Sequence, residues 1–154
     1  MNVDFEKAFD CLRWEFVEKV MTSFNFGETL IRWVKLFYKD ISSKIINNGW
    51  LSESFFPQRG ARQGCPLSPY IFIICAEVLS NEIRNDNQIQ GLTLGTKRFI
   101  ISQYADDTIL TLRYNEQSLI QVIEKFKQFE TNSGLKVNFD KTEIIPIGPI
   151  KYDY

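Results

Sequence analysis

The amino-acid sequence predicts one α+β domain, in which an antiparallel sheet is covered on one face by helices in a split βαβ pattern. Its 154 residues, 44% of them hydrophobic, are enough for about one domain with its own core. Short apolar runs beside turn residues alternate with longer stretches of helical periodicity. Together these give the order strand, helices, hairpin, helix, hairpin, helix, strand, with no internal repeats or linkers.

The first quarter of the chain predicts a short strand and two helices. The strand lies around Asp4 and runs into a helix. Apolar residues then recur at helical spacing, at Trp14, Val17, Met21 and Phe24. Gly27 is expected to end this helix. The second helix has a predicted core face made of Leu30, Ile31, Val34, Phe37 and Tyr38.

The middle of the chain predicts a projecting hairpin, a loop and a third helix. Asn48-Gly49 separates two β-prone runs, and this dipeptide favours a tight hairpin turn. The loop over residues 58–69 contains two glycines and two prolines, and Ser68 is expected to cap the helix that follows. The core face of that helix is expected to carry Phe72, Ala76, Leu79 and Ile83.

Two adjacent acids, Asp106 and Asp107, lie between β-prone runs at 98–101 and 109–112. This pattern predicts a hairpin with both carboxylates at or beside its tip. A preceding hairpin is expected over residues 91–99. Asp is a favoured turn residue, so the pair alone indicates only a turn.

The last third predicts a helix and a final strand. Asn115 is expected to cap the helix and Gly134 to end it. The alternating segment 135–139 then predicts a strand, with Lys141 just beyond it.

Composition excludes several kinds of chemistry. The chain has no histidine, which rules out Ser-His-Asp and Cys-His catalysis and histidine-ligated zinc. Its three cysteines show no metal-binding spacing and indicate reduced thiols of an intracellular protein, nuclear or cytoplasmic and not secreted. The longest apolar run, residues 70–76, is too short for a membrane span. The net charge of −1 decides little about nucleic-acid binding, because metal ions bound to acids would restore positive charge.

A second acidic segment, residues 2–10, gives the Asp pair a further meaning. A site for two divalent cations needs carboxylates from several elements, and Asp4 lies on a separate predicted strand. Glu6 and Asp10 are competing acids, which we expect to be surface or capping residues.

Four segments in order resemble successive motifs of reverse transcriptases, across nearly the whole chain. They are VDFEKAFD at 3–10, RQGCPLSP at 62–69, YADD at 104–107, and SGLKVN at 133–138 with Lys141. The RQGCPLSP segment is closer to the enzymes of non-LTR, LINE-type retrotransposons than to retroviral or group II intron enzymes.

The resemblance implies a ferredoxin-like polymerase palm over residues 1–11 and 58–150, with residues 12–57 as part of the fingers. The upstream fingers and the downstream thumb are expected to be absent. It also implies an RNA-directed DNA polymerase that extends the 3′-hydroxyl of a DNA primer on an RNA template with dNTPs, using Mg²⁺, for which Mn²⁺ can substitute. The oligomeric state stays open.

The resemblance also assigns the site residues. Asp4, Asp106 and Asp107 match the metal-binding catalytic triad, and Lys141 matches the lysine that assists the departing pyrophosphate. Phe9 matches the residue beneath the incoming sugar, with core packing as its alternative. Arg62, Gln63, Gly64 and Tyr104 match residues around the incoming nucleotide and the template.

Two other functions remain open at this point. One is a catalytically inactive fragment derived from a retrotransposon, which binds only nucleic acid or a partner. The other is a different metal-dependent phosphotransferase or hydrolase that uses the same carboxylates.

Overall fold

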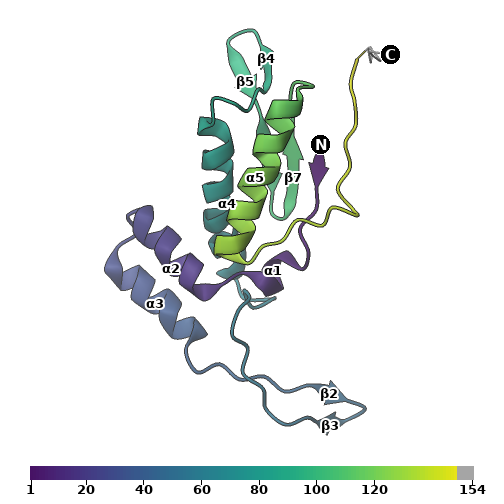
Figure 1. Ribbon diagram of the computed structural model, residues 1–154. Coiled ribbons are helices and arrows are strands. Elements are labelled where there is room, and N and C mark those ends of the chain that lie inside the picture. Colours follow the sequence, from purple (N-terminus) through teal and green to yellow (C-terminus); the bar gives the residue numbers. More distant parts are fainter. Residues whose placement is uncertain (149–154) are drawn as a thin grey trace.

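The computed structural model describes residues 1–148, and its elements follow the predicted order as far as the last helix (Figure 1). The helices are α1 (Ala8–Cys11), α2 (Trp14–Ser23), α3 (Glu28–Tyr38), α4 (Ser68–Asn85) and α5 (Glu116–Ser133). The strands are β1 (Asn2–Val3), β2 (Ile46–Asn47), β3 (Trp50–Leu51), β4 (Leu92–Leu94), β5 (Lys97–Phe99), β6 (Ile101–Tyr104) and β7 (Asp107–Leu110). The last two residues assigned to the predicted palm, 149 and 150, lie outside the described residues.

The central sheet has three antiparallel strands in the order β1-β7-β6. On the free side of β1, the segment after α5 forms two isolated bridges, Phe5 with Val137 and Asn2 with Glu143. Counting this segment as a fourth member, the spatial order is that of the predicted split βαβ fold. The α+β fold class is therefore confirmed.

The final strand predicted over 135–139 is wrong in extent, because this segment pairs only through those bridges. A turn interrupts it, in which the Thr142 hydroxyl donates to the Asn138 carbonyl at 2.7 Å. The predicted alternation is present only over 135–137, since Leu135 and Val137 are buried and Lys136 is exposed, whereas Phe139 is exposed.

Helices α4 and α5 pack together over one face of the sheet (Figure 1). Val3, Thr108 and Leu110 point into this layer and are almost fully buried. The predicted apolar face of α4 is buried as expected, at Phe72, Ala76, Leu79 and Ile83. Within residues 1–148, no helix packs on the opposite face, where Asn2, Ile109 and Tyr104 are exposed. The sheet thus has one face in the core and one open face.

The two N-terminal helices differ from the prediction at their junction. Helix α2 ends before Asn25, whose φ of 58° allows the Phe26 N–H to reach the Met21 carbonyl at 3.0 Å. Gly27 has extended backbone angles and precedes α3 as its N-cap, so it begins the second helix and does not end the first.

The predicted core face of α3 is only partly buried. Val34 is buried, and Ile31 and Tyr38 pack against the core. The assignment of Leu30 and Phe37 to the core was wrong, because no described element covers that side of α3 and both side chains are exposed.

Two hairpins project from the body at opposite ends of Figure 1. One is the β2-β3 hairpin, which turns at Asn48 and Gly49 with positive φ angles, as predicted. The other is the β4-β5 hairpin, which spans the predicted 91–99 segment.

The strands of the acidic hairpin end at other residues than predicted. The hairpin is formed by β6 and β7, not by the runs at 98–101 and 109–112. Lys97–Phe99 belong to β5, because they pair with β4.

Within the described residues, no helix is long and apolar enough to span a membrane.

Candidate functional site

The register of the sheet brings the two acidic segments together. Strand β1 pairs with β7 through Asn2 opposite Ile109 and Val3 opposite Thr108. Continuing this antiparallel register by one residue places Asp4 opposite Asp107. Directly opposed residues of antiparallel strands have Cα atoms about 4.5–5.5 Å apart. The neighbouring acids that the sequence predicted are therefore placed by backbone pairing at one end of the sheet.

Side-chain alternation places both of these acids on the open face. Val3 and Thr108 are 1% and 0% exposed, facing the helices. Successive side chains in a strand point to opposite faces, so the next residue along each strand, Asp4 and Asp107, faces away from the core. Tyr104, which is opposite Asp107 on β6, is 84% exposed on the same side.

Asp106 lies in the tight turn between these strands. Tyr104 and Asp107 are the last pair of the β6-β7 ladder, so the turn consists of Ala105 and Asp106 alone. Ala105 has a φ of 52°, a conformation that costs a residue with a Cβ about 1–3 kcal/mol. The carboxylate of Asp106 is exposed beside that of Asp107. The turn thus holds two exposed acids next to each other on a short, conformationally restricted segment.

The donor set suits a hard divalent cation, but the side chains do not form a closed site. Carboxylate oxygens are the ligands that Mg²⁺ prefers. Among residues 1–148, however, no three acidic or cysteine side chains are gathered closely enough to hold a metal ion. The structure therefore provides the backbone placement of Asp4, Asp106 and Asp107 and not a preformed ligand shell.

The loop before α4 is clamped to the segment that follows Asp4. The Ala61 N–H donates to the Phe9 carbonyl at 2.6 Å, and the Gly60 N–H donates to the Leu12 carbonyl at 2.7 Å. The indole N–H of Trp14 donates to the Gly60 carbonyl at 2.8 Å. Because residue 9 follows closely on Asp4, these bonds hold the loop at the acidic end of the sheet.

The predicted nucleotide-contacting residues of this loop are exposed. Gln63 donates from Nε2 to a carboxylate oxygen of Asp10 at 3.2 Å, and Arg62 extends from the surface. Gly64 has a φ of 81°, and a Cβ built there would meet no atom within 4 Å. The loop therefore presents polar side chains and an accessible stretch of backbone.

Ser68 was wrongly predicted as the helix cap. It is the first residue of α4, after an N-cap at Leu67, and it is buried. Its hydroxyl donates to the Arg62 carbonyl at 2.7 Å, so it ties the loop to the helix.

Phe9 is half-buried and stacks on Phe72 of α4, with ring centroids 4.7 Å apart. Part of the ring packs against the core and part is accessible. The structure is thus compatible with both readings of this residue, core packing and contact with a ligand.

Lys141 lies in the turn beyond Val137. Its N–H donates to the carbonyl and side-chain oxygens of Asn138, both at 3.3 Å, and the Asn138 N–H donates to the Asp4 carbonyl at 2.8 Å. The turn that carries Lys141 is thus attached to the backbone of Asp4. Glu6, one of the competing acids, forms an exposed ion pair with Lys136 at 3.2 Å.

The sequence did not reveal a buried polar chain behind the acidic turn. The Ser80 hydroxyl of α4 donates to the side-chain oxygen of Gln103, and Gln103 Nε2 donates to the Thr108 hydroxyl oxygen at 3.2 Å. Ser80 and Thr108 are nearly inaccessible. The alternation of side chains along β7 could have revealed it, because Thr108 falls on the same buried face as Leu110.

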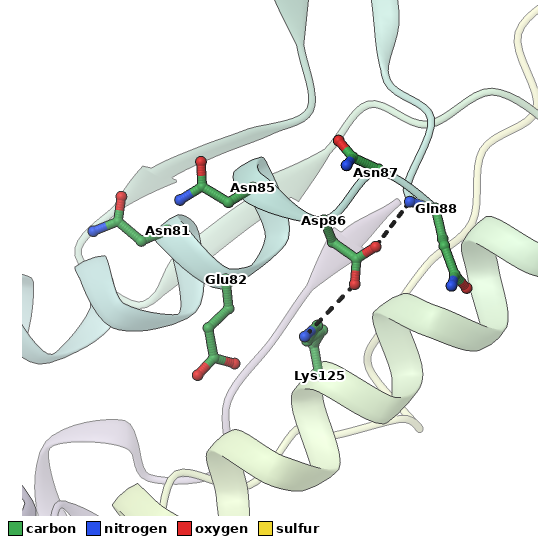
Figure 2. Close-up of a pocket in the computed structure, with 7 residues that line it drawn as sticks. All are labelled: Asn81, Glu82, Asn85, Asp86, Asn87, Gln88 and Lys125. Atoms are coloured by element: carbon green, nitrogen blue, oxygen red, sulfur yellow. Dashed lines mark hydrogen bonds and ion pairs between the residues drawn. The ribbon is translucent and has the colours of Figure 1, made fainter.

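A pocket of about 620 Å³, lined by polar residues, lies at the far end of α4 (Figure 2). It is lined by the last turns of α4, the 86–88 segment and Lys125 of α5, whose Nζ lies 3.6 Å from Asp86 Oδ2. Glu82 also lines it, with one buried carboxylate oxygen that has no hydrogen-bond partner among the described residues. None of the predicted site residues lines this pocket, so it is separate from the acidic end of the sheet.

Comparison with known sequences gives a match to a protein family. Residues 1–152 match the family model described as reverse transcriptase (RNA-dependent DNA polymerase). A Retrovirus-related Pol polyprotein from type-2 retrotransposable element R2DM of Drosophila melanogaster is 29% identical over 140 residues, which cover 91% of this chain. The Transposon TX1 uncharacterized 149 kDa protein of Xenopus laevis is 27% identical over 156 residues, covering 100% of this chain. The chain spans only 13% and 12% of the length of these two relatives.

Among solved structures, telomerase from Candida tropicalis in complex with a fragment of telomeric RNA has a similar fold. The TM-score is 0.69 at 15% identity, over 91% of this chain and 24% of that one. A truncated apo form of the same telomerase gives a TM-score of 0.65 at 18% identity, over 91% of this chain and 29% of that one.

Proposed function

Because this chain belongs to the reverse transcriptase family, we propose that it is the catalytic core of an RNA-directed DNA polymerase that extends a DNA primer on an RNA template. The observation that carries the proposal is the β1-β7 register, which brings Asp4 opposite Asp107 on the open face beside Asp106. These are the three acids that the sequence motifs mark as the catalytic triad.

The three carboxylates would hold two Mg²⁺ ions, or Mn²⁺ in their place. Bound divalent cations activate an attacking hydroxyl and neutralise charge on the transferred and departing phosphates. Asp4 and Asp107 approach such a centre from adjacent strands, and Asp106 approaches it from the turn. The side chains would have to rotate to bring their oxygens together, since no three acids are gathered closely enough among residues 1–148.

The clamped loop would position the incoming dNTP. Gly64 leaves its backbone open to close approach, and Gln63 offers both a donor and an acceptor. Arg62 supplies a charge for phosphate or template. The accessible part of the Phe9 ring would exclude a ribose 2′-hydroxyl, and Tyr104 would contact the primer-template from the open face.

Lys141 would neutralise or protonate the departing pyrophosphate. Its flexible stem and its three N–H donors suit this role, and its turn is attached to the backbone of Asp4. In the domain arrangement that we propose, residues 1–11 and 58–150 form the palm and residues 12–57 form part of the fingers.

Primer extension with the purified chain tests the proposal. An RNA template, a labelled DNA primer and dNTPs are incubated with Mg²⁺ or Mn²⁺, and Asp106→Asn is compared with the parent chain. We expect template-directed incorporation that falls by more than about 100-fold in the variant, because a metal ligand is lost.

Asp40→Asn provides a matched control, since Asp40 is exposed at the end of α3 and has no proposed role. It should extend primers like the parent chain. Incorporation that persists in Asp106→Asn would refute the assigned triad. Nucleic-acid binding without incorporation in any variant would favour the alternative of an inactive fragment.

A further inference from the structure

The buried chain of Ser80, Gln103 and Thr108 lies directly behind the acidic turn. Gln103 and Thr108 are opposite each other in the β6-β7 ladder, and Ser80 reaches them from α4. Within the described sheet they form the one cross-strand pair in which both side chains are polar and point toward the helices. The other β6-β7 pair on that face, Ile101 opposite Leu110, is apolar, and on the β1 side Thr108 lies opposite the apolar Val3.

A buried hydrogen-bonded pair specifies strand register more strictly than apolar pairs do. Apolar side chains tolerate a shift along the partner strand, because many arrangements bury similar area. A shift of β6 along β7 would instead separate the partly buried Gln103 amide from the Thr108 hydroxyl and leave that hydroxyl buried without a partner. Such a shift would also disrupt the two-residue turn that carries Asp106, whereas the β1-β7 register that places Asp107 opposite Asp4 is separate from it.

The chain also joins the acidic turn to the loop before α4. Ser80 lies on the same helix as Ser68, whose hydroxyl holds the Arg62 carbonyl. One helix therefore connects the loop and the hairpin through two buried hydroxyls, one at its first residue and one five residues before its end.

We infer that Ser80, Gln103 and Thr108 are positioning residues that lock the register of β6 and β7 and thereby fix the two-residue turn that holds Asp106 beside Asp107. The catalytic consequence rests on the proposed function, whereas the register lock does not. The three side chains act through the strands and do not touch substrate.

Thr108→Val and Thr108→Ser form the first test. Valine keeps the branched shape but removes the hydroxyl that Gln103 donates to, and serine keeps the hydroxyl. Amide hydrogen exchange measured by NMR should be about tenfold faster over residues 101–110 in Thr108→Val, and close to the parent rate in Thr108→Ser.

Thr93→Val is the matched control, because Thr93 is an exposed cross-strand residue opposite Arg98 in the separate β4-β5 hairpin. Exchange over 101–110 should not change in this variant. Equal rates in Thr108→Val and the parent chain would overturn the lock. So would equal acceleration by valine and serine, since that would reflect packing and not the hydrogen bond.

Primer extension tests the catalytic consequence of the register lock. In Thr108→Val, the Mg²⁺ concentration for half-maximal extension should rise about tenfold, with Thr108→Ser restoring the parent value. An unchanged Mg²⁺ requirement beside accelerated exchange would refute the catalytic consequence. A parent chain that extends no primer would count against the proposed function, and the exchange comparison would still decide the register lock.

Discussion

Replacing Gly60 with alanine should loosen the clamp between the loop before α4 and the segment after Asp4. Gly60 has a φ of 97°, and a Cβ there would lie 2.9 Å from the carbonyl oxygen and 3.2 Å from the carbonyl carbon of Asp10. Both neighbouring atoms are backbone, so they cannot rotate away. Gly64 in the same loop has a φ of 81° but open space around it, which makes Gly64→Ala the matched control.

The expected magnitudes follow from these two environments. The positive φ costs an alanine about 1–2 kcal/mol at either position. The overlap with the Asp10 backbone adds about 1–3 kcal/mol at position 60 alone, the usual range for forced displacement in a packed region. Reduced entropy of the unfolded chain offsets both substitutions by a similar amount and cancels in the comparison.

Urea unfolding at 25 °C measures the difference. With a slope of about 2 kcal/mol per molar, the midpoint of Gly60→Ala should lie about 0.5–1.5 M below that of Gly64→Ala. The amide protons of Gly60 and Ala61, which bond to the Leu12 and Phe9 carbonyls, should also exchange faster in Gly60→Ala. Equal midpoints for the two variants would show that the close approach of Gly60 to Asp10 does not hold the loop.

Three further predictions concern the acids, the nucleotide and the thiols. Asp4→Ala should abolish metal-supported synthesis and leave the melting temperature within a few degrees, because clustered carboxylates repel one another without a cation; a large drop in melting temperature would contradict this. Phe9→Val should increase ribonucleotide incorporation relative to deoxynucleotide in primer extension, and an unchanged preference would assign Phe9 to packing on Phe72 alone. Iodoacetamide at pH 7.5 should modify Cys65 well before Cys75, as followed by mass spectrometry. Hydrogen bonding from the Leu67 backbone, with smaller contributions from Ser68 and the Arg62 charge, lowers the pKa of the Cys65 thiol, whereas burial raises the pKa of Cys75 to about 12; faster labelling of Cys75 would refute this order.

The sequence predicted the fold class and the family, because both depend on patterns that are local. Periodicity identified the buried face of α4, and Asn115 and Gly134 marked the ends of α5 as the structure has them. The resemblance to non-LTR retrotransposon enzymes is confirmed by the family match and by the retrotransposon relatives. The roles of the site residues stay predictions.

The errors arose where segments far apart in the sequence decide the structure, either because they pair as strands or because they cover a helix face. An apolar stretch such as 98–101 has no local marker of which residues pair with β4 and which with β7, so the strand ends were misplaced. Periodicity on α3 predicts an apolar stripe correctly but cannot show what covers it, and Leu30 and Phe37 are exposed. Gln103 reads as a solvent-facing strand residue, and only its contact with Ser80 reveals the buried chain.

The two-residue turn at Ala105 and Asp106 makes the molecule unequally tolerant of insertions and deletions. Adding or removing one residue beside Asp107 would exchange the faces of β7, turning Thr108 toward solvent and an acid toward the core. The same change at the Asn48-Gly49 turn would only alter a hairpin whose side chains are already exposed. Length variation among descendants of this sequence should therefore accumulate around residues 40–57 and be purged between β6 and β7.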